Sequence, residues 1–125
     1  MSDSPGDPRP EPSPPAPAPL PEVVPTLRPE HLTEADAEAV AEVMQALASA
    51  ARIRILAALL VAPRPVGELA EDLDLGQPTV SNHLRLLRHL GLVTGRREGR
   101  NVVYALHDEH VSALLRQVLA HVHHA

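Results

Sequence analysis

The most constraining feature of the 125-residue sequence is a pair of short amphipathic segments joined by a three-residue turn. Apolar residues at helical spacing predict two helices, over residues 66–73 and 77–90. Pro78 marks the start of the second helix, because proline near the first helical position loses no hydrogen bond. The turn Asp74-Leu75-Gly76 lies between them, and Gly91 ends the second helix. Two short helices joined by a tight glycine-containing turn predict a helix-turn-helix.

The second helix of this pair carries polar residues near its N-terminal end: Gln77, Thr79, Ser81, Asn82 and Arg85. Short polar side chains at such a position can reach base edges in the major groove, and an arginine can reach guanine or phosphate. Taken alone, these residues are equally compatible with an ordinary solvated helix face.

A β-hairpin is predicted directly after this helix. Residues 92–97 and 101–106 have strand propensity, and Glu98-Gly99-Arg100 forms the turn between them. Arg96, Arg97 and Arg100 lie near the tip. A solvated hairpin would also explain these arginines, but a cationic hairpin that follows a helix-turn-helix is typical of a wing that contacts the DNA backbone or minor groove. The expected fold is therefore mainly α with a small β-hairpin, a winged helix-turn-helix.

Charge and composition support a nucleic-acid partner locally. The net charge is −5, but residues 77–104 contain five arginines and a single acidic residue, Glu98. A local basic patch suffices for DNA binding even in an acidic protein. There is no cysteine, which excludes disulfides and thiolate metal sites. With Tyr104 as the only aromatic residue, one copy buries little apolar surface, and pairing with a second copy would add to it.

The N-terminal part of the chain differs from the rest. Residues 1–30 hold eleven of the fourteen prolines, so we expect a disordered tail, followed by one folded domain over residues 31–125. The domain should begin with helices capped by Thr33 and Ser49. The tail lacks the pattern of a signal peptide, and no stretch approaches the ~20 apolar residues of a membrane span. We expect a cytoplasmic protein without a membrane partner.

The C-terminal residues 107–125 combine two patterns on one predicted helix. An apolar stripe consists of Val111, Leu114, Leu115, Val118, Leu119 and Val122. Along its rim lie Asp108, His110, His121 and His124. His110 and His121 are almost three turns apart, about 16 Å, so one metal ion cannot reach both within one helix. An antiparallel second copy would bring His121 and His124 to the partner's Asp108 and His110. The alternative is an incidental histidine-rich tail.

These motifs together resemble the ArsR/SmtB family of winged-helix repressors. The resemblance covers about residues 38–125 and is most specific over 68–92 (ELAEDLDLGQPTVSNHLRLLRHLGL). It implies a homodimer, formed through the N- and C-terminal helices, that binds a palindromic operator and is released by an effector. Relatives that sense soft metals use cysteines, and here Pro65 stands where such a thiolate would be expected. The family's other arrangement, D-x-H-x10-H-x2-H, matches Asp108, His110, His121 and His124 without a gap.

Three imidazoles and one carboxylate suit tetrahedral Zn(II), whereas Ni(II) or Co(II) would prefer more ligands. The expected function is a zinc-released transcriptional repressor. A Ni(II) or Co(II) sensor of the same fold, or a winged-helix repressor with a non-metal effector, remains the alternative. A metal buffer is a further alternative. An enzyme is not expected, because the closed ligand set offers neither an open coordination position nor an obvious general base.

Overall fold

The computed structural model describes residues 28–123 of the chain. A short 3-10 turn, η1 (Pro29–His31), precedes the helices α1 (Glu34–Leu47), α2 (Ala50–Val61), α3 (Val66–Leu73) and α4 (Gln77–His89). Strands β3 (Val93–Glu98) and β4 (Asn101–Leu106) form the hairpin, and α5 (Glu109–His123) ends the described chain. Most of the predicted tail, residues 1–27, and His124 lie outside the described residues.

Both predicted caps at the start of the domain are confirmed. Thr33 and Asp36 form a capping box at α1, in which the Asp36 N–H donates to Thr33 Oγ1 at 3.0 Å and the Thr33 N–H donates to Asp36 Oδ2 at 3.4 Å. The Ser49 hydroxyl accepts the N–H of Arg52 at 3.3 Å and caps α2. The axes of α1 and α2 differ by 88°. No single helix among residues 28–123 is long and apolar enough to cross a membrane.

The hydrophobic core lies where α2, α3, α4, the hairpin and the first turns of α5 meet. Its largest fully buried side chains are Ile55, Leu56, Leu69, Val80, Leu84, Leu87 and Val93. The apolar residues whose helical spacing predicted α3 and α4 face the core: Leu69, Ala70, Val80, Leu84 and Leu87 are buried, and Val66, Leu73 and Leu90 are half-buried against them. This core fixes α3 and α4 relative to each other.

The sheet has one strand more than the sequence predicts. A two-residue strand, β2 (Arg64–Pro65), pairs antiparallel with β4, so the order is β2-β4-β3. Its residues Arg64 and Pro65 align with Tyr104 and Val103. Pro65 is tolerated because β2 is an edge strand, where proline's missing N–H removes no inner ladder bond. The predicted hairpin is confirmed, and β2 adds a third strand that the sequence did not indicate.

The loop of the hairpin is one residue shorter than predicted, because β3 extends through Glu98. Glu98 pairs with Asn101, which leaves Gly99 and Arg100 as a two-residue loop. Gly99 has a φ of 65°, a value that glycine adopts without steric cost. Gly95 lies opposite Tyr104, whose ring packs across the space where a side chain would stand.

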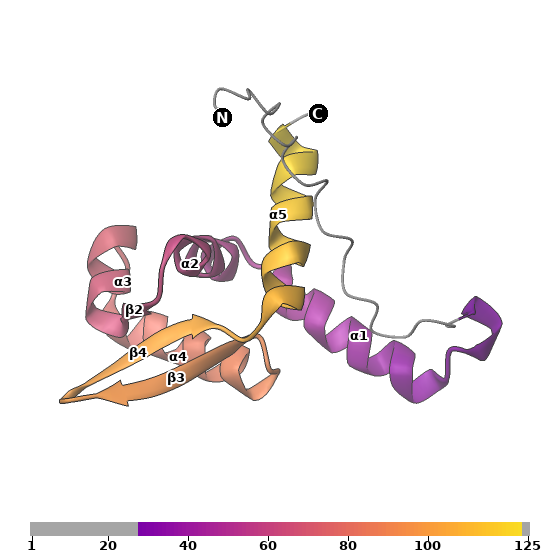
Figure 1. Cartoon of the computed structure of the whole chain (residues 1–125), viewed down its shortest axis with the longest axis horizontal. Helices are drawn as coiled ribbons and strands as arrows, with labels where there is room; N and C mark the ends of the chain where they lie inside the picture. The colour runs from indigo at the N-terminus through magenta and orange to yellow at the C-terminus, as the bar shows by residue number, and fades with distance from the viewer. Residues whose placement is uncertain (1–27, 124–125) are drawn as a thin grey trace, which may run out of the picture.

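Helices α1 and α5 project away from the winged helix-turn-helix unit in different directions (Figure 1). Residues 34–42 of α1 are all exposed. In α5 the first two turns contribute Val111 and Leu115 to the core, whereas Val118 and Val122 are 48% and 63% exposed. A single chain thus leaves apolar parts of both helices uncovered.

Candidate DNA-binding surface and metal site

The polar face of α4 lies on the surface, as predicted. Gln77, Thr79, Asn82 and Arg85 are exposed, and Ser81 is half-buried. The buried residues of α4 occupy its opposite face, so packing of the core orients this polar row outward. The Arg85 guanidinium donates to Asn82 Oδ1 at 3.3 Å, which links the two side chains along the helix. This row has the chemistry for direct base contacts.

The three predicted wing arginines are exposed at the hairpin, but they are not equivalent. Arg96 donates through Nε to Glu98 at 3.0 Å and also forms an ion pair with it, so its charge is largely balanced within the strand. Arg96 and Arg97 are consecutive on β3 and therefore point to opposite faces of the sheet. No acidic partner is described for Arg97 and Arg100 among residues 28–123. These two residues are the stronger candidates for phosphate contacts.

A hollow of about 450 Å³ separates the wing from the start of α4. Gln77 and Arg100, both predicted DNA contacts, line it together with Tyr104. The carboxylates of Glu68 and Glu71 line the same hollow, which the sequence analysis did not anticipate. Helical spacing places Glu68 and Glu71 on one face of α3, but nothing in the sequence shows that the wing lies over that face.

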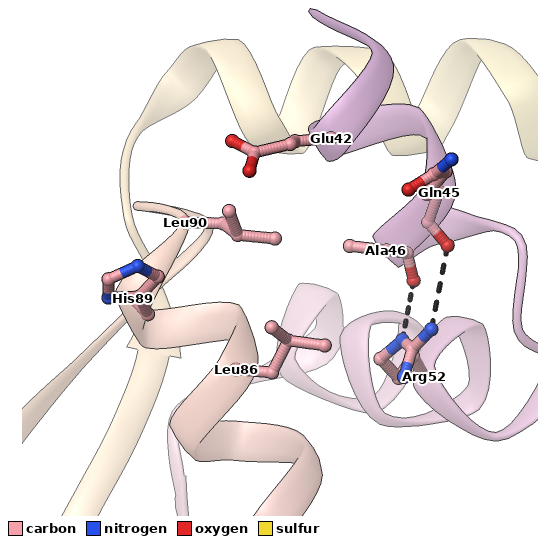
Figure 2. A pocket seen from close by; sticks show the side chains of 7 residues that line it. All are labelled: Glu42, Gln45, Ala46, Arg52, Leu86, His89 and Leu90. Atoms are coloured by element: carbon pink, nitrogen blue, oxygen red, sulfur yellow. Dashed lines mark hydrogen bonds between the residues drawn. The ribbon is translucent and has the colours of Figure 1, made fainter. Parts of the chain in front are cut away.

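A second hollow, of about 270 Å³, lies where α1, α2 and the end of α4 meet. Figure 2 shows the Arg52 guanidinium at one side of it, donating to the backbone of the last turn of α1. The Arg52 Nε lies 2.6 Å from the carbonyl oxygen of Ala46, and the C-terminal end of a helix favours a cation. Arg52 therefore holds the bend between α1 and the winged helix-turn-helix unit.

Of the four predicted metal ligands, the structure brings Asp108 and His110 together. Asp108 Oδ2 lies 3.3 Å from His110 Nδ1 at the start of α5. The other oxygen, Oδ1, accepts the N–H of Val111 at 3.2 Å and caps the helix. This backbone hydrogen bond lowers the pKa of Asp108 below its ordinary value of 3.8; desolvation opposes the shift, and His110 and His107 add to it. Asp108 is therefore an anion at neutral pH.

His121 is exposed near the other end of α5, and His124 lies outside the described residues. No group of three or more histidine, aspartate or glutamate side chains within residues 28–123 is close enough to hold a metal ion. The described part of one chain thus presents Asp108 and His110 as a pair. The four-ligand set stays a prediction that needs a second chain.

Comparison with known proteins identifies the fold. Residues 49–94 match the family described as "Bacterial regulatory protein, arsR family". The regulator NmtR of Mycobacterium tuberculosis is 48% identical over 85 residues, which cover 68% of this chain and 71% of NmtR. The chain belongs to the ArsR family. The SmtB homologue of Synechocystis, a transcriptional repressor, is 40% identical over 101 residues, 81% of this chain and 76% of that protein.

A solved structure, described as that of a possible ArsR-family regulator, shows the same architecture. The homodimeric winged helix-turn-helix domain of Mb0332 from Mycobacterium bovis superposes with a TM-score of 0.67 at 36% identity, covering 73% of this chain and 88% of the other. These relatives are transcriptional regulators, so the ArsR chain is a DNA-binding regulator and not an enzyme. The surface formed by α4 and the hairpin is the candidate DNA-binding surface of this fold.

Proposed function

We propose that this ArsR-family protein is a cytoplasmic, metal-responsive repressor that binds a palindromic operator as a homodimer. Binding of Zn(II) at two sites shared between the C-terminal helices releases the operator. The proposal rests on the apolar stripe of α5, which is buried in its first half and exposed in its second half. Val111 and Leu115 pack into their own chain, whereas Val118 and Val122 stay exposed beside His121. The exposed half of the stripe requires a covering partner, and that partner brings the ligands together.

The dimer would form through α1 and α5. Val40 and Met44 of α1 are 50% and 52% exposed, on a helix whose first nine residues are all exposed. The C-terminal part of this 14-residue helix packs into the core through Val43, Ala46 and Leu47, whereas a helical segment without such packing is marginal in water. An apolar groove of about 330 Å³ lies between α1, α2 and α5 and includes Met44, Ile53 and Val118. A second copy seated there would cover these residues, and Mb0332 is homodimeric.

The Asp108–His110 pair fits one half of a tetrahedral zinc shell. Two atoms bound to zinc at 2.0–2.1 Å lie about 3.3 Å apart in tetrahedral geometry. Asp108 Oδ2 and His110 Nδ1 already have this separation, 3.3 Å. His121 and His124 of the partner would supply the two remaining nitrogens. Because Oδ1 stays engaged with Val111, Asp108 can act as a ligand and keep its capping role.

A short backbone path connects this pair to α4. The N–H of His107 donates to the carbonyl of Leu92 at 3.0 Å, and the N–H of Leu92 donates to the carbonyl of Leu87 at 2.8 Å. Leu87 is fully buried in α4. A metal-induced shift at the start of α5 would therefore reach the C-terminal end of the helix that contacts DNA. Bound metal would favour a dimer whose α4 helices no longer match two half-sites one helical turn apart.

The test is binding to the palindrome upstream of the protein's own gene, titrated separately with Zn(II), Ni(II) and Co(II). We expect Zn(II) to release the wild-type protein and to have little effect on Asp108→Asn. Glu109→Gln is the matched control, because it removes a neighbouring carboxylate and should respond as the wild type does. Release only by Ni(II) or Co(II) would change the assigned metal. Indifference to all three ions would contradict metal sensing, and failure to bind the palindrome would contradict repression.

A further inference from the structure

Two arginines from different elements hold the end of α3, the first helix of the helix-turn-helix. Arg54 of α2 donates through a terminal nitrogen to the carbonyl of Leu73 at 2.8 Å. Arg64 of β2 donates to Asp72 Oδ2 at 2.7 Å. Both cations stand at the C-terminal end of α3, where the helix dipole favours positive charge. The turn that leads from α3 into α4 begins directly after these contacts, at Asp74.

Arg64 is the member of this pair that also belongs to the sheet. Its backbone aligns with Tyr104 of β4, which is the strand shared between β2 and the wing. Its guanidinium is bound to α3. The Arg64–Asp72 pair is therefore a direct side-chain link between the wing's sheet and the helix-turn-helix.

The surroundings of Arg64 distinguish this pair from the other arginine–carboxylate pair of the sheet. The Arg64 side chain is 21% exposed, whereas that of Arg96 is 73% exposed. Arg64 Nε is buried and has no hydrogen-bond partner among the described residues. Loss of Asp72 would leave a poorly solvated cation without its counter-charge, and the guanidinium would have to move to recover solvation. Arg96 and Glu98 lie within one strand and connect no two elements.

We propose that Arg64 and Asp72 are positioning residues for DNA binding, which set the separation between the wing and α4. They act through Arg97 and Arg100, whose distance from the α4 contacts decides whether both reach phosphates of one operator. The proposal is independent of any metal, because it concerns the operator affinity of the metal-free protein.

The test compares Asp72→Asn with Glu71→Gln. Both variants remove one negative charge from adjacent residues of α3, but only Asp72 holds Arg64. Simple electrostatics predicts equal or tighter DNA binding for both, since a repelling carboxylate is lost. The positioning role predicts that Asp72→Asn weakens operator binding by about fivefold or more and flattens its salt dependence, whereas Glu71→Gln does not.

A second background separates positioning from general destabilisation. The Arg97→Ala/Arg100→Ala protein lacks the two wing arginines through which the pair is proposed to act, so Asp72→Asn should there change operator affinity by less than about twofold. Thermal melting checks that each variant is folded, and Arg64→Gln, which removes the other member of the pair, replaces Asp72→Asn if the latter does not fold. If Asp72→Asn lowers operator affinity equally in both backgrounds, or in neither, the proposal is overturned.

Discussion

Oδ2 of Asp108 lies 3.3 Å from Nδ1 of His110 while Oδ1 of the same carboxylate accepts the N–H of Val111. One side chain thus begins α5 and offers an anionic oxygen beside an imidazole. The capping and ligand roles use different oxygens, so substitution can separate them.

Asp108→Asn should preserve the cap and weaken zinc binding. The asparagine oxygen can still accept from Val111, since asparagine caps helices about as well as aspartate. Without the negative charge, we expect zinc affinity to fall by at least about tenfold while the melting temperature stays near that of the wild type. Asp108→Ala should lower both the zinc affinity and the melting temperature. Calorimetric zinc titration and thermal melting measure the two effects, and equal melting temperatures for Asn and Ala variants would contradict the capping role.

The zinc response should disappear on mild acidification without loss of the fold. Imidazole ligands bind metal only when neutral, and an ordinary histidine has a pKa of about 6.5. The pKa of Asp108 is lowered by its hydrogen bond from Val111, so its contribution to stability is fully present above 3.8 and is lost only as the pH falls below that value. Operator release by zinc, followed by fluorescence anisotropy, should be strong at pH 7.5 and weak at pH 5.5. Circular dichroism should be unchanged between the two.

A charge introduced into the exposed half of the apolar stripe of α5 should dissociate the dimer into monomers. Val122→Glu places a carboxylate where the proposed seam excludes water, and Val122 is 63% exposed in the single chain. Sedimentation velocity should show a monomer, with operator affinity lost at the same protein concentrations. Gln117→Glu introduces the same charge at another exposed position of α5 and should leave a dimer. A dimeric Val122→Glu protein would exclude this seam.

Two glycines should respond to substitution with opposite signs. A Cβ at Gly95 would lie 3.1 Å from Tyr104 Cε1 and 3.2 Å from Val102 Cγ1, so Gly95→Val should destabilise the protein by about 1–3 kcal/mol. A Cβ at Gly67 in α3 meets nothing within 4 Å, so Gly67→Ala should stabilise it by about 0.4–1 kcal/mol. Chemical denaturation measures both, and a neutral Gly95→Val would show that the wing adapts freely.

The sequence was sufficient for the helices and for the outward polar face of α4 because periodicity and capping residues are local signals. Thr33, Ser49 and Pro78 marked helix starts that the structure confirms. Strand β2 was missed because two residues are too few to show a periodicity. The sequence also did not indicate the contact between Arg64 and Asp72, because their pairing depends on tertiary packing.

In the candidate sites, too, some features follow from local sequence signals and others depend on tertiary packing. The outward polar row of α4 follows from which residues its core face buries, which the sequence displays. The pairing of Arg96 with Glu98 changes the charge that the wing offers, and it became visible only once β3 was seen to extend through Glu98. Periodicity also predicted the α5 stripe as one surface, although Val111 and Leu115 pack within the chain and Val122 does not. Spacing alone cannot tell which neighbour covers a stripe.

The central claim is that each metal site takes ligands from two chains, and mixing two defective proteins tests it directly. Asp108→Ala/His110→Ala lacks one half of every site, and His121→Ala/His124→Ala lacks the other half. Neither protein alone should bind zinc tightly. After subunit exchange, each mixed dimer should contain one complete site, so the mixture should regain high-affinity zinc binding at one ion per mixed dimer. If the mixture binds zinc no better than its parents although mixed dimers form, the sites are not shared between chains.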